Sequence, residues 1–143
     1  MSVFVIDASV AAKWFLPDRS ETLVDEATQL LARYAEGQVR VLVPDLFWAE
    51  FGNILWKAVR RGRCSQKAAE TGLAAMKSRG LPTITSGTLV EAAFAIATAF
   101  DRTVYDSLYI ALAIDCQGQL ITADEKLANA VAAHLPVKWL GSL

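Results

Sequence analysis

The sequence is poor in the residues that most often bind transition metals or form disulfides. Its 143 residues include one histidine, His134, and two cysteines, Cys64 and Cys116. The cysteines lie far apart without Cys-x-x-Cys spacing, so neither a zinc site nor a dithiol motif is indicated. We therefore expect two free, buried thiols in a reducing compartment, and a structural or exposed role for His134.

The sequence also lacks an excess of positive charge and a long apolar run. Its 14 Lys and Arg residues are balanced by 15 Asp and Glu residues, which gives a net charge of −1. Binding of a polyanion would therefore depend on a local basic patch or on a bound metal. The most apolar stretch, residues 89–100, contains Glu91 and is shorter than the roughly 20 residues of a membrane span. Because the N-terminus lacks a signal-peptide pattern, we expect a soluble cytoplasmic protein without a membrane partner.

No glycine-rich phosphate loop is present, which disfavours a nucleotide-binding switch. The length is that of one domain, so we expect a single domain over residues 1–143. Hydrophobic residues make up 54% of the chain and charged residues 20%, as in compact globular proteins.

Short apolar segments alternate with helical ones along the chain. The predicted strands are 3–6, 40–43, 83–85, 119–122 and 137–139. Three predicted helices have both ends defined, at 21–36, 45–61 and 105–116. Four more are recognised by how they start: one is capped by Ser9 and ended by Pro17, one is capped by Ser65, one begins with a Thr88–Glu91 capping box, and one begins at Asp124. This alternation predicts an α/β protein, a three-layer α/β/α sandwich with a short, mainly parallel central sheet.

Three acidic residues lie where ligands of such a sheet bind, at the carboxyl ends of its strands. Asp7 follows the first strand, and Asp124 follows the strand at 119–122. Asp106 begins a helix that leads into the 119–122 strand, so it is expected near the same edge. Each of the three, taken alone, is equally explained as a helix N-cap.

Glu50 is harder to explain as a structural residue. It lies well past the first turn of its helix, inside the aromatic-rich segment LFWAEFGNILW (46–56), where capping does not apply. Glutamate is almost never fully buried without a partner. The alternative is that Glu50, Asn53 and Lys57 form a polar stripe that faces water.

Convergence of these four acids would be costly, because two unit charges about 4 Å apart repel by about 4 kcal/mol at an effective dielectric near 20. Such a cluster either takes up protons or holds cations. Carboxylates without His or Cys suit Mg²⁺ or Mn²⁺ rather than zinc. The chemistry that uses such a site is phosphodiester hydrolysis.

Four segments occur in an order and spacing that match a known family. They are VIDASVAAKWFLPD (5–18), VPDLFWAEFGNILWKAVRRGR (43–63), TVYDSLYIALA (103–113) and LITADEKLA (120–128). In these segments the chain resembles PIN-domain ribonucleases, most closely the VapC-type toxins of toxin–antitoxin (VapBC) pairs. Residues 65–86 match least well.

The resemblance implies a PIN-like nuclease domain with an acidic pocket that binds Mg²⁺, with Mn²⁺ as a substitute. It implies that Asp7 and Asp106 are the principal metal ligands, and that Glu50 and Asp124 complete the catalytic set directly or through water. Small polar residues near the metal in the family correspond to Ser9 and Thr122. By this resemblance the protein is a homodimeric endoribonuclease toxin that cleaves RNA and is inhibited by a VapB-type antitoxin.

A basic segment, KAVRRGR (57–63), ends the helix that carries Glu50. Lys57, Arg60 and Arg61 are candidates for contacts to RNA phosphates, but cations are also favourable at any helix C-terminus. Several of the aromatic residues at 14–15 and 47–56 are candidates for an apolar groove that receives an antitoxin helix, although most are expected in the core.

Two further interpretations remain open. A haloacid-dehalogenase-type phosphohydrolase also begins with an Asp after its first strand, but it needs a second Asp two residues later, where this chain has Ser9. A catalytically silent PIN-fold binding module is the other alternative, and the complete set of acids argues against it.

Overall fold

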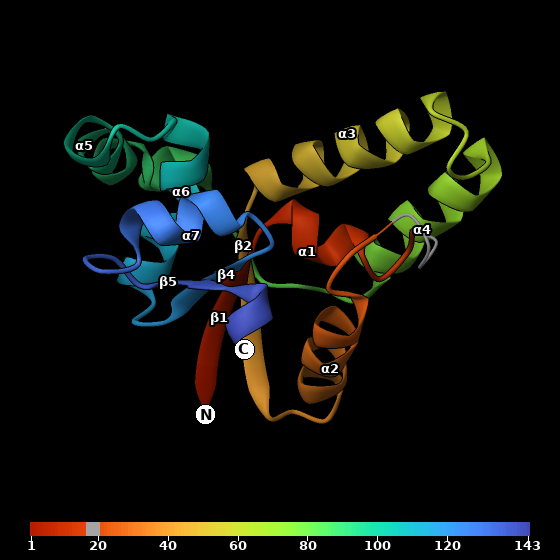
Figure 1. The fold of residues 1–143 in the computed structure, drawn as a ribbon, viewed down its shortest axis with the longest axis horizontal. Coiled ribbons are helices and arrows are strands. Elements are labelled where there is room, and N and C mark those ends of the chain that lie inside the picture. Colours follow the sequence, from red (N-terminus) through yellow and green to blue (C-terminus); the bar gives the residue numbers. More distant parts are fainter. Residues whose placement is uncertain (17–20) are drawn as a thin grey trace.

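The computed structural model describes residues 1–16 and 21–143 and is drawn in Figure 1. Within these residues one sheet contains the strands β1 (Ser2–Ile6), β2 (Val39–Pro44), β3 (Thr83–Ile84), β4 (Gln119–Thr122) and β5 (Val137–Trp139). All neighbouring strands are parallel, in the order β3-β2-β1-β4-β5. The predicted parallel sheet is therefore confirmed, with β1 at its centre.

Helices lie on both faces of this sheet, as the three-layer prediction requires. They are α1 (Ala8–Ala12), α2 (Val24–Ala35), α3 (Leu46–Arg60), α4 (Gln66–Ser78), α5 (Val90–Phe100), α6 (Val104–Asp115) and α7 (Glu125–Val131), with 3₁₀ turns at Ser86–Thr88 and Leu140–Ser142. Helix α6 contacts β1, β2 and β4, and α5 packs against α6. Figure 1 shows α3 and α4 as a hairpin that extends away from the sheet.

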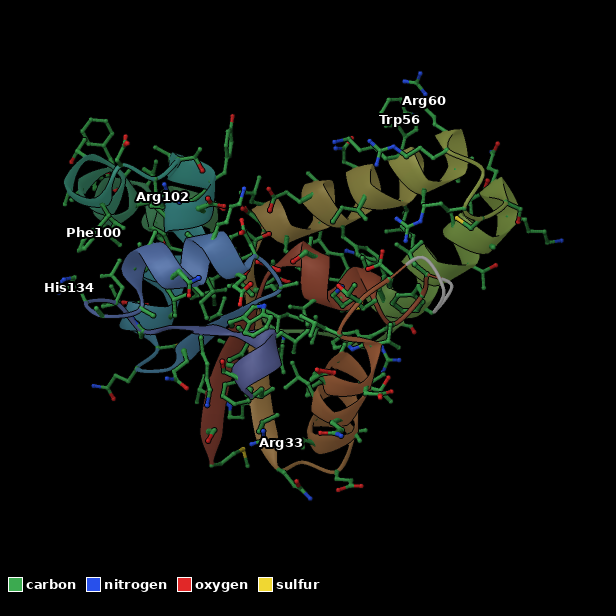
Figure 2. All side chains as sticks on the ribbon, in the orientation of Figure 1. Arg33, Trp56, Arg60, Phe100, Arg102 and His134 are labelled. Atoms are coloured by element: carbon green, nitrogen blue, oxygen red, sulfur yellow. The ribbon has the colours of Figure 1, made fainter. Side chains whose placement is uncertain are left out.

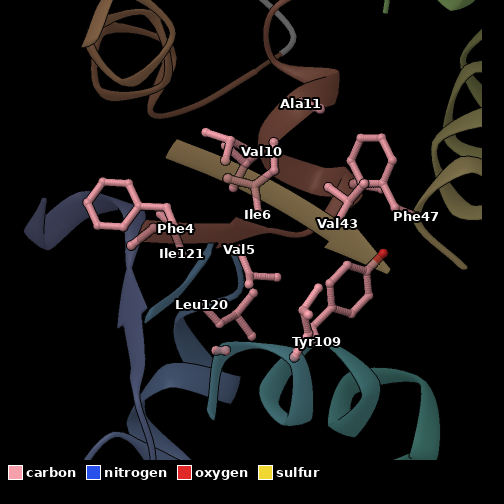
Figure 3. Close-up of a cluster of buried hydrophobic side chains, with 14 of the residues drawn as sticks. Phe4, Val5, Ile6, Val10, Ala11, Val43, Phe47, Tyr109, Leu120 and Ile121 are labelled. Atoms are coloured by element: carbon pink, nitrogen blue, oxygen red, sulfur yellow. The ribbon is translucent and has the colours of Figure 1, made fainter. Parts of the chain in front are cut away.

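The core consists of two apolar layers, one on each face of the sheet. Figure 3 shows Val5 and Leu120 on the side of α6, and Ile6 and Val10 on the side of α1. All four side chains are completely buried. Strands covered on both faces read as continuous apolar runs, which is why VFVI is entirely apolar and the centre of β4 is Leu120 and Ile121. The packing fixes the carboxyl ends of β1 and β4 side by side.

Close approach of β4 to β1 requires glycine just before β4. A Cβ atom added at Gly118 would lie 2.4 Å from the backbone oxygen of Val3, which is shorter than any tolerable contact. The chain can therefore begin β4 beside β1 only because this position has no side chain. In the resulting register Ile6 pairs with Ile121. The residue that follows each of them, Asp7 or Thr122, is polar.

Several predicted helix starts are wrong in detail. Helix α1 is capped by Asp7 rather than Ser9, and the helix expected from residue 21 begins at Val24. The Thr88–Glu91 capping box does not form, because the Thr88 hydroxyl donates to the Thr85 carbonyl in a 3₁₀ turn. The caps at Ser65 and Asp124 are confirmed. The helix end expected at Pro17 lies outside the described residues.

The remaining structural expectations are met in part. Cys64 and Cys116 are free thiols, but both are partly rather than fully buried. His134 is exposed. Among the described helices, none is both long enough and apolar enough to cross a bilayer.

Candidate active site

The four predicted acids line one cavity of about 260 Å³ at the carboxyl edge of the sheet. Asp7 and Asp124 follow β1 and β4, while Glu50 comes from α3 and Asp106 from the first turn of α6. The cavity lining is Asp7, Ala8, Ser9, Glu50, Asn53, Ile54, Asp106, Tyr109 and Asp124. None of these lining residues is basic, so the described part of the chain places no cation in the cavity to balance its carboxylates.

Asp7 is held in one orientation by hydrogen bonds to both of its carboxylate oxygens. Its Oδ1 accepts from the Ser9 hydroxyl at 2.5 Å and from the Val10 N–H at 3.3 Å. Its Oδ2 accepts from the Thr122 hydroxyl at 2.5 Å. Thr122 is completely buried, and its oxygen also accepts from the Asp124 N–H. The two hydroxyls proposed as supporting residues therefore lie directly beside Asp7.

Burial makes the charge on Asp7 unfavourable. Desolvation raises the pKa of Asp7 to about 6, and the nearby Glu50 carboxylate adds to the rise. The hydrogen bonds from Ser9, Thr122 and Val10 act in the opposite direction, because they stabilise the ionised form. Desolvation is the largest effect, so the protein by itself disfavours the ionised form of Asp7.

Glu50 lies half-buried between two other acids and one phenol. Desolvation raises the pKa of Glu50, the hydrogen bond from Tyr109 lowers it, and the Asp106 carboxylate raises it. The Tyr109 hydroxyl donates to Glu50 Oε1 at 2.5 Å. Burial and the Glu50 carboxylate raise the pKa of Tyr109, so the phenol stays protonated and can donate. The polar stripe of Glu50, Asn53 and Lys57 is thus partly buried at Glu50 and exposed further along.

Asp106 and Asp124 complete the acidic cluster on its outer side. Thr103, not Asp106, is the N-cap of α6, since its hydroxyl accepts from the Asp106 N–H at 3.0 Å. Asp106 is therefore not the N-cap. Burial raises the pKa of Asp106 and Asp124 raises it further, whereas Arg102 and a hydrogen bond from the Thr103 side chain lower it. Asp124 is more exposed and accepts from the Leu127 N–H as the N-cap of α7.

Tyr109 and Arg102 both act on the acids of this site, and neither was predicted from the sequence. Tyr109 stands three residues after Asp106, on the same face of α6, and it is the hydroxyl-bearing residue of the otherwise apolar run 108–114. The spacing of three residues from Asp106 therefore indicates that the Tyr109 side chain lies near the same cavity. Arg102 precedes α6, and its influence on Asp106 depends on the geometry of the turn that leads into the helix.

The chemistry of the cavity fits a hydrated divalent ion better than a fully enclosed one. Among residues 1–16 and 21–143, no three His, Cys, Asp or Glu side chains form a group that could hold a metal ion by itself. Mg²⁺ needs no such group, because it keeps several waters and takes one or two carboxylates. A lining that supplies four carboxylates and no His, Cys or basic residue suits Mg²⁺ or Mn²⁺.

The predicted RNA-contacting residues do not lie at the acidic cavity. Lys57, Arg60 and Arg61 line a second hollow of about 300 Å³ together with Trp56, at the C-terminal end of α3. The Arg60 guanidinium lies 4.9 Å from the centre of the Trp56 ring. Figure 2 shows Trp56 and Arg60 near the tip of the α3–α4 hairpin, pointing away from the body of the molecule.

Comparison with known proteins identifies the class to which this fold and cavity belong. The model of the PIN domain family matches residues 4–132. The chain therefore belongs to the PIN-domain family. The particular relative that it resembles is Ribonuclease VapC3 of Pyrobaculum aerophilum, which is 31% identical over 135 residues, or 90% of this chain and 95% of that protein. The resemblance drawn from the sequence is confirmed.

Solved structures agree with this assignment at the level of the fold. The structure of PAE2754 from Pyrobaculum aerophilum matches with a TM-score of 0.70 and 22% identity, covering 99% of this chain and 94% of that one. A chain of a toxin–antitoxin complex from Klebsiella pneumoniae matches with a TM-score of 0.61 and 16% identity, covering 96% of both chains. The predicted PIN-like α/β/α fold is therefore confirmed.

The raised pKa of Asp7 predicts how the stability of the metal-free protein depends on pH. Asp7 binds its proton near pH 6 when folded and near its ordinary value of 3.8 when unfolded. The stabilising contribution of this proton is therefore complete below about pH 3.8 and is lost as the pH rises through about 6. By pH 7 the loss approaches about 3 kcal/mol of unfolding free energy.

The measurement is urea unfolding in EDTA from pH 4 to pH 7.5, for the wild type and for Asp7→Asn, whose amide does not titrate. The wild type should lose stability relative to the variant as the pH rises. Parallel pH profiles for the two proteins would show that ionisation of Asp7 does not destabilise the folded state.

Proposed function

We propose that the protein is a Mg²⁺- or Mn²⁺-dependent endoribonuclease that acts as the toxin of a toxin–antitoxin pair, with residues 1–143 acting as one PIN-like nuclease domain. The observation that carries this proposal is the clustering of Asp7, Glu50, Asp106 and Asp124 around one cavity without a basic residue in its lining. The name of the relative Ribonuclease VapC3 supports RNA as the substrate class.

The proposed roles follow from how firmly each carboxylate is held. Asp7 and Asp106 are the principal metal ligands, because both have short side chains on well-packed elements. Glu50 and Asp124 complete the site directly or through water, and one of them orients the attacking water. A divalent ion bound there supplies an activated water and stabilises the leaving oxygen. Ser9 and Thr122 keep the Asp7 carboxylate turned into the site through their hydrogen bonds.

A protein antitoxin of the VapB type is the proposed inhibitor, and the active form is proposed to be a homodimer. The match to a chain of a toxin–antitoxin complex supports the first part. An apolar hollow between α3 and α4, lined by residues such as Leu55, Trp56 and Leu73, is a suitable place for an apolar helix face.

RNA cleavage should depend on Asp7 and Asp106. Asp7→Asn and Asp106→Asn retain the size and most hydrogen bonds of the native side chains but lose a negative ligand. Loss of a hydrogen-bond partner behind a metal ligand costs about 10–100-fold, so loss of a ligand should lower the cleavage rate by about 100-fold or more. The assay is cleavage of total RNA with and without Mg²⁺, with the cut ends mapped.

Asp115→Asn provides the matched control, because Asp115 is exposed at the other end of α6 and lies outside the cavity. It should cleave like the wild type. Undiminished metal-dependent cleavage in both Asp7→Asn and Asp106→Asn would contradict the assigned roles. A wild type that cleaves no RNA with either metal would point to a silent binding module instead.

Metal binding should stabilise the folded protein, because a bound cation relieves repulsion among the carboxylates. Metal at about 100 times its Kd adds about 2.7 kcal/mol, which corresponds to a rise in melting temperature of about 5 °C or more. Differential scanning fluorimetry at pH 7.5 with Mg²⁺ or Mn²⁺ measures this rise. Asp7→Asn should show a much smaller rise, and an unchanged wild-type melting temperature would count against the site.

The basic end of α3 is proposed to bind RNA phosphates outside the acidic cavity, near the tip of the α3–α4 hairpin. Lys57, Arg60 and Arg61 are exposed, and no salt bridge within the described residues involves any of them. Trp56, which is 53% exposed, already has the Arg60 guanidinium over its ring and offers a surface on which a base can stack.

Neutralising Arg60 and Arg61 should reduce the salt dependence of RNA binding. Each lost phosphate contact lowers the slope of log K against log salt by about 0.7 for a single strand, so the double Gln variant should lose about 1.4. A matched double variant of Arg33 and Arg40, which lie on α2 and β2, controls for net charge. An equal salt slope in the two double variants would mean that Arg60 and Arg61 do no more than stabilise the C-terminus of α3.

A further inference from the structure

Tyr109 is the one tyrosine in the lining of the acidic cavity, among the residues that the structure describes. It lies on α6, one turn after Asp106, and is only 2% exposed. Figure 3 shows its hydroxyl directed away from α6, toward the side of the sheet where Phe47 of α3 lies. The aromatic ring belongs to the core, whereas the hydroxyl reaches the cavity.

The hydroxyl of Tyr109 connects three separate elements. It donates to Glu50 Oε1 on α3 at 2.5 Å, and it accepts a hydrogen bond from the backbone of Ala8, the residue after Asp7. The buried O–H of Tyr109 needs an acceptor, and Glu50 Oε1 is the acceptor that the described residues provide, since the Ala8 backbone donates to the phenol oxygen instead. The phenol proton therefore links the buried ring on α6 directly to a carboxylate of the cavity on α3.

Glu50 needs an anchor more than the other three acids do. Asp7 is fixed by two hydroxyls, and Asp106 and Asp124 have short side chains in the first turn or at the N-cap of a helix. The Glu50 side chain has one more rotatable bond, and both Asp7 and Asp106 repel it. Without a donor, repulsion and the recovered rotamer freedom would favour turning the carboxylate outward to water.

We propose that Tyr109 is a positioning residue that holds Glu50 toward the metal-binding cavity through its hydrogen bond to Oε1. The bond leaves Oε2 without a donor among the described residues, so this oxygen is available to a bound ion or to a metal-bound water. This inference rests on the proposed metal-dependent nuclease site and adds a residue to it.

A double-mutant cycle of Tyr109→Phe and Glu50→Ala tests the inference, because alanine removes the acceptor of the Tyr109 hydroxyl. Tyr109→Phe keeps the buried ring and removes only the hydroxyl. The first readout is the Kd for Mn²⁺, measured from the free-ion signal in electron paramagnetic resonance. The second is kcat and KM on an RNA that the wild type cleaves. Loss of the hydrogen bond should weaken Mn²⁺ binding and lower kcat by about tenfold or more in total, with KM nearly unchanged.

In the Glu50→Ala background the same tyrosine change should alter both quantities by less than about twofold. Tyr105→Phe is the matched control, because Tyr105 is on the same helix, is 62% exposed and lies outside the cavity lining. It should behave like the wild type. An equal loss from Tyr109→Phe in both backgrounds, or no loss in either, would overturn the inference.

A second variant keeps the test decisive if Tyr109→Phe does not fold. Glu50→Asp leaves the core intact and withdraws the carboxylate from Tyr109, so it should also weaken Mn²⁺ binding; wild-type affinity in this variant would contradict the inference. Failure of the proposed function gives a different result. A wild type that binds Mn²⁺ but cleaves no RNA disproves the nuclease, whereas the Mn²⁺ cycle still decides the role of Tyr109.

Discussion

Mutual repulsion among carboxylates held at one edge of a parallel sheet is the constraint on which this structure depends. The packing of β1 against β4, and of α3 and α6 around them, places four acids on one cavity that has no basic residue in its described lining. Asp7, Glu50 and Asp106 each have a raised pKa for which burial is the largest cause. A fold that maintains such an arrangement stores an unfavourable interaction that protons or a divalent cation relieve.

The hydrogen bonds around the cavity determine orientation rather than neutralise charge. Hydroxyl groups of Ser9, Thr122 and Tyr109 donate to Asp7 and Glu50, and none of them carries a positive charge. Neutral donors fix a carboxylate without competing electrostatically with an incoming cation, as a lysine or arginine would. The positive side chains at the end of α3 lie instead in a separate hollow, where they are available to a polyanionic substrate.

The parallel sheet and the convergence of the four acids on one edge were predictable from the sequence, because both depend on strong local signals. Short apolar runs alternating with helices predict the parallel sheet, and the acids just after VFVI and QLIT predict the edge where Asp7 and Asp124 meet. Glu50 was predictable because nothing local explains a carboxylate there. Caps were less predictable, since Thr103, Asp106, Asp7 and Ser9 all satisfy the same preference and tertiary contacts select among them. The contact of Tyr109 with Glu50 joins residues 59 positions apart, and no local pattern specifies it.

The central claim is that the acidic cavity is built to hold a divalent cation. Its most direct test is a crystal structure of the protein grown with Mn²⁺ at neutral pH, with anomalous diffraction data collected near the manganese edge. The account predicts an anomalous peak inside the cavity lined by Asp7, Glu50, Asp106 and Asp124. A crystal at saturating Mn²⁺ with no peak in this cavity would contradict it.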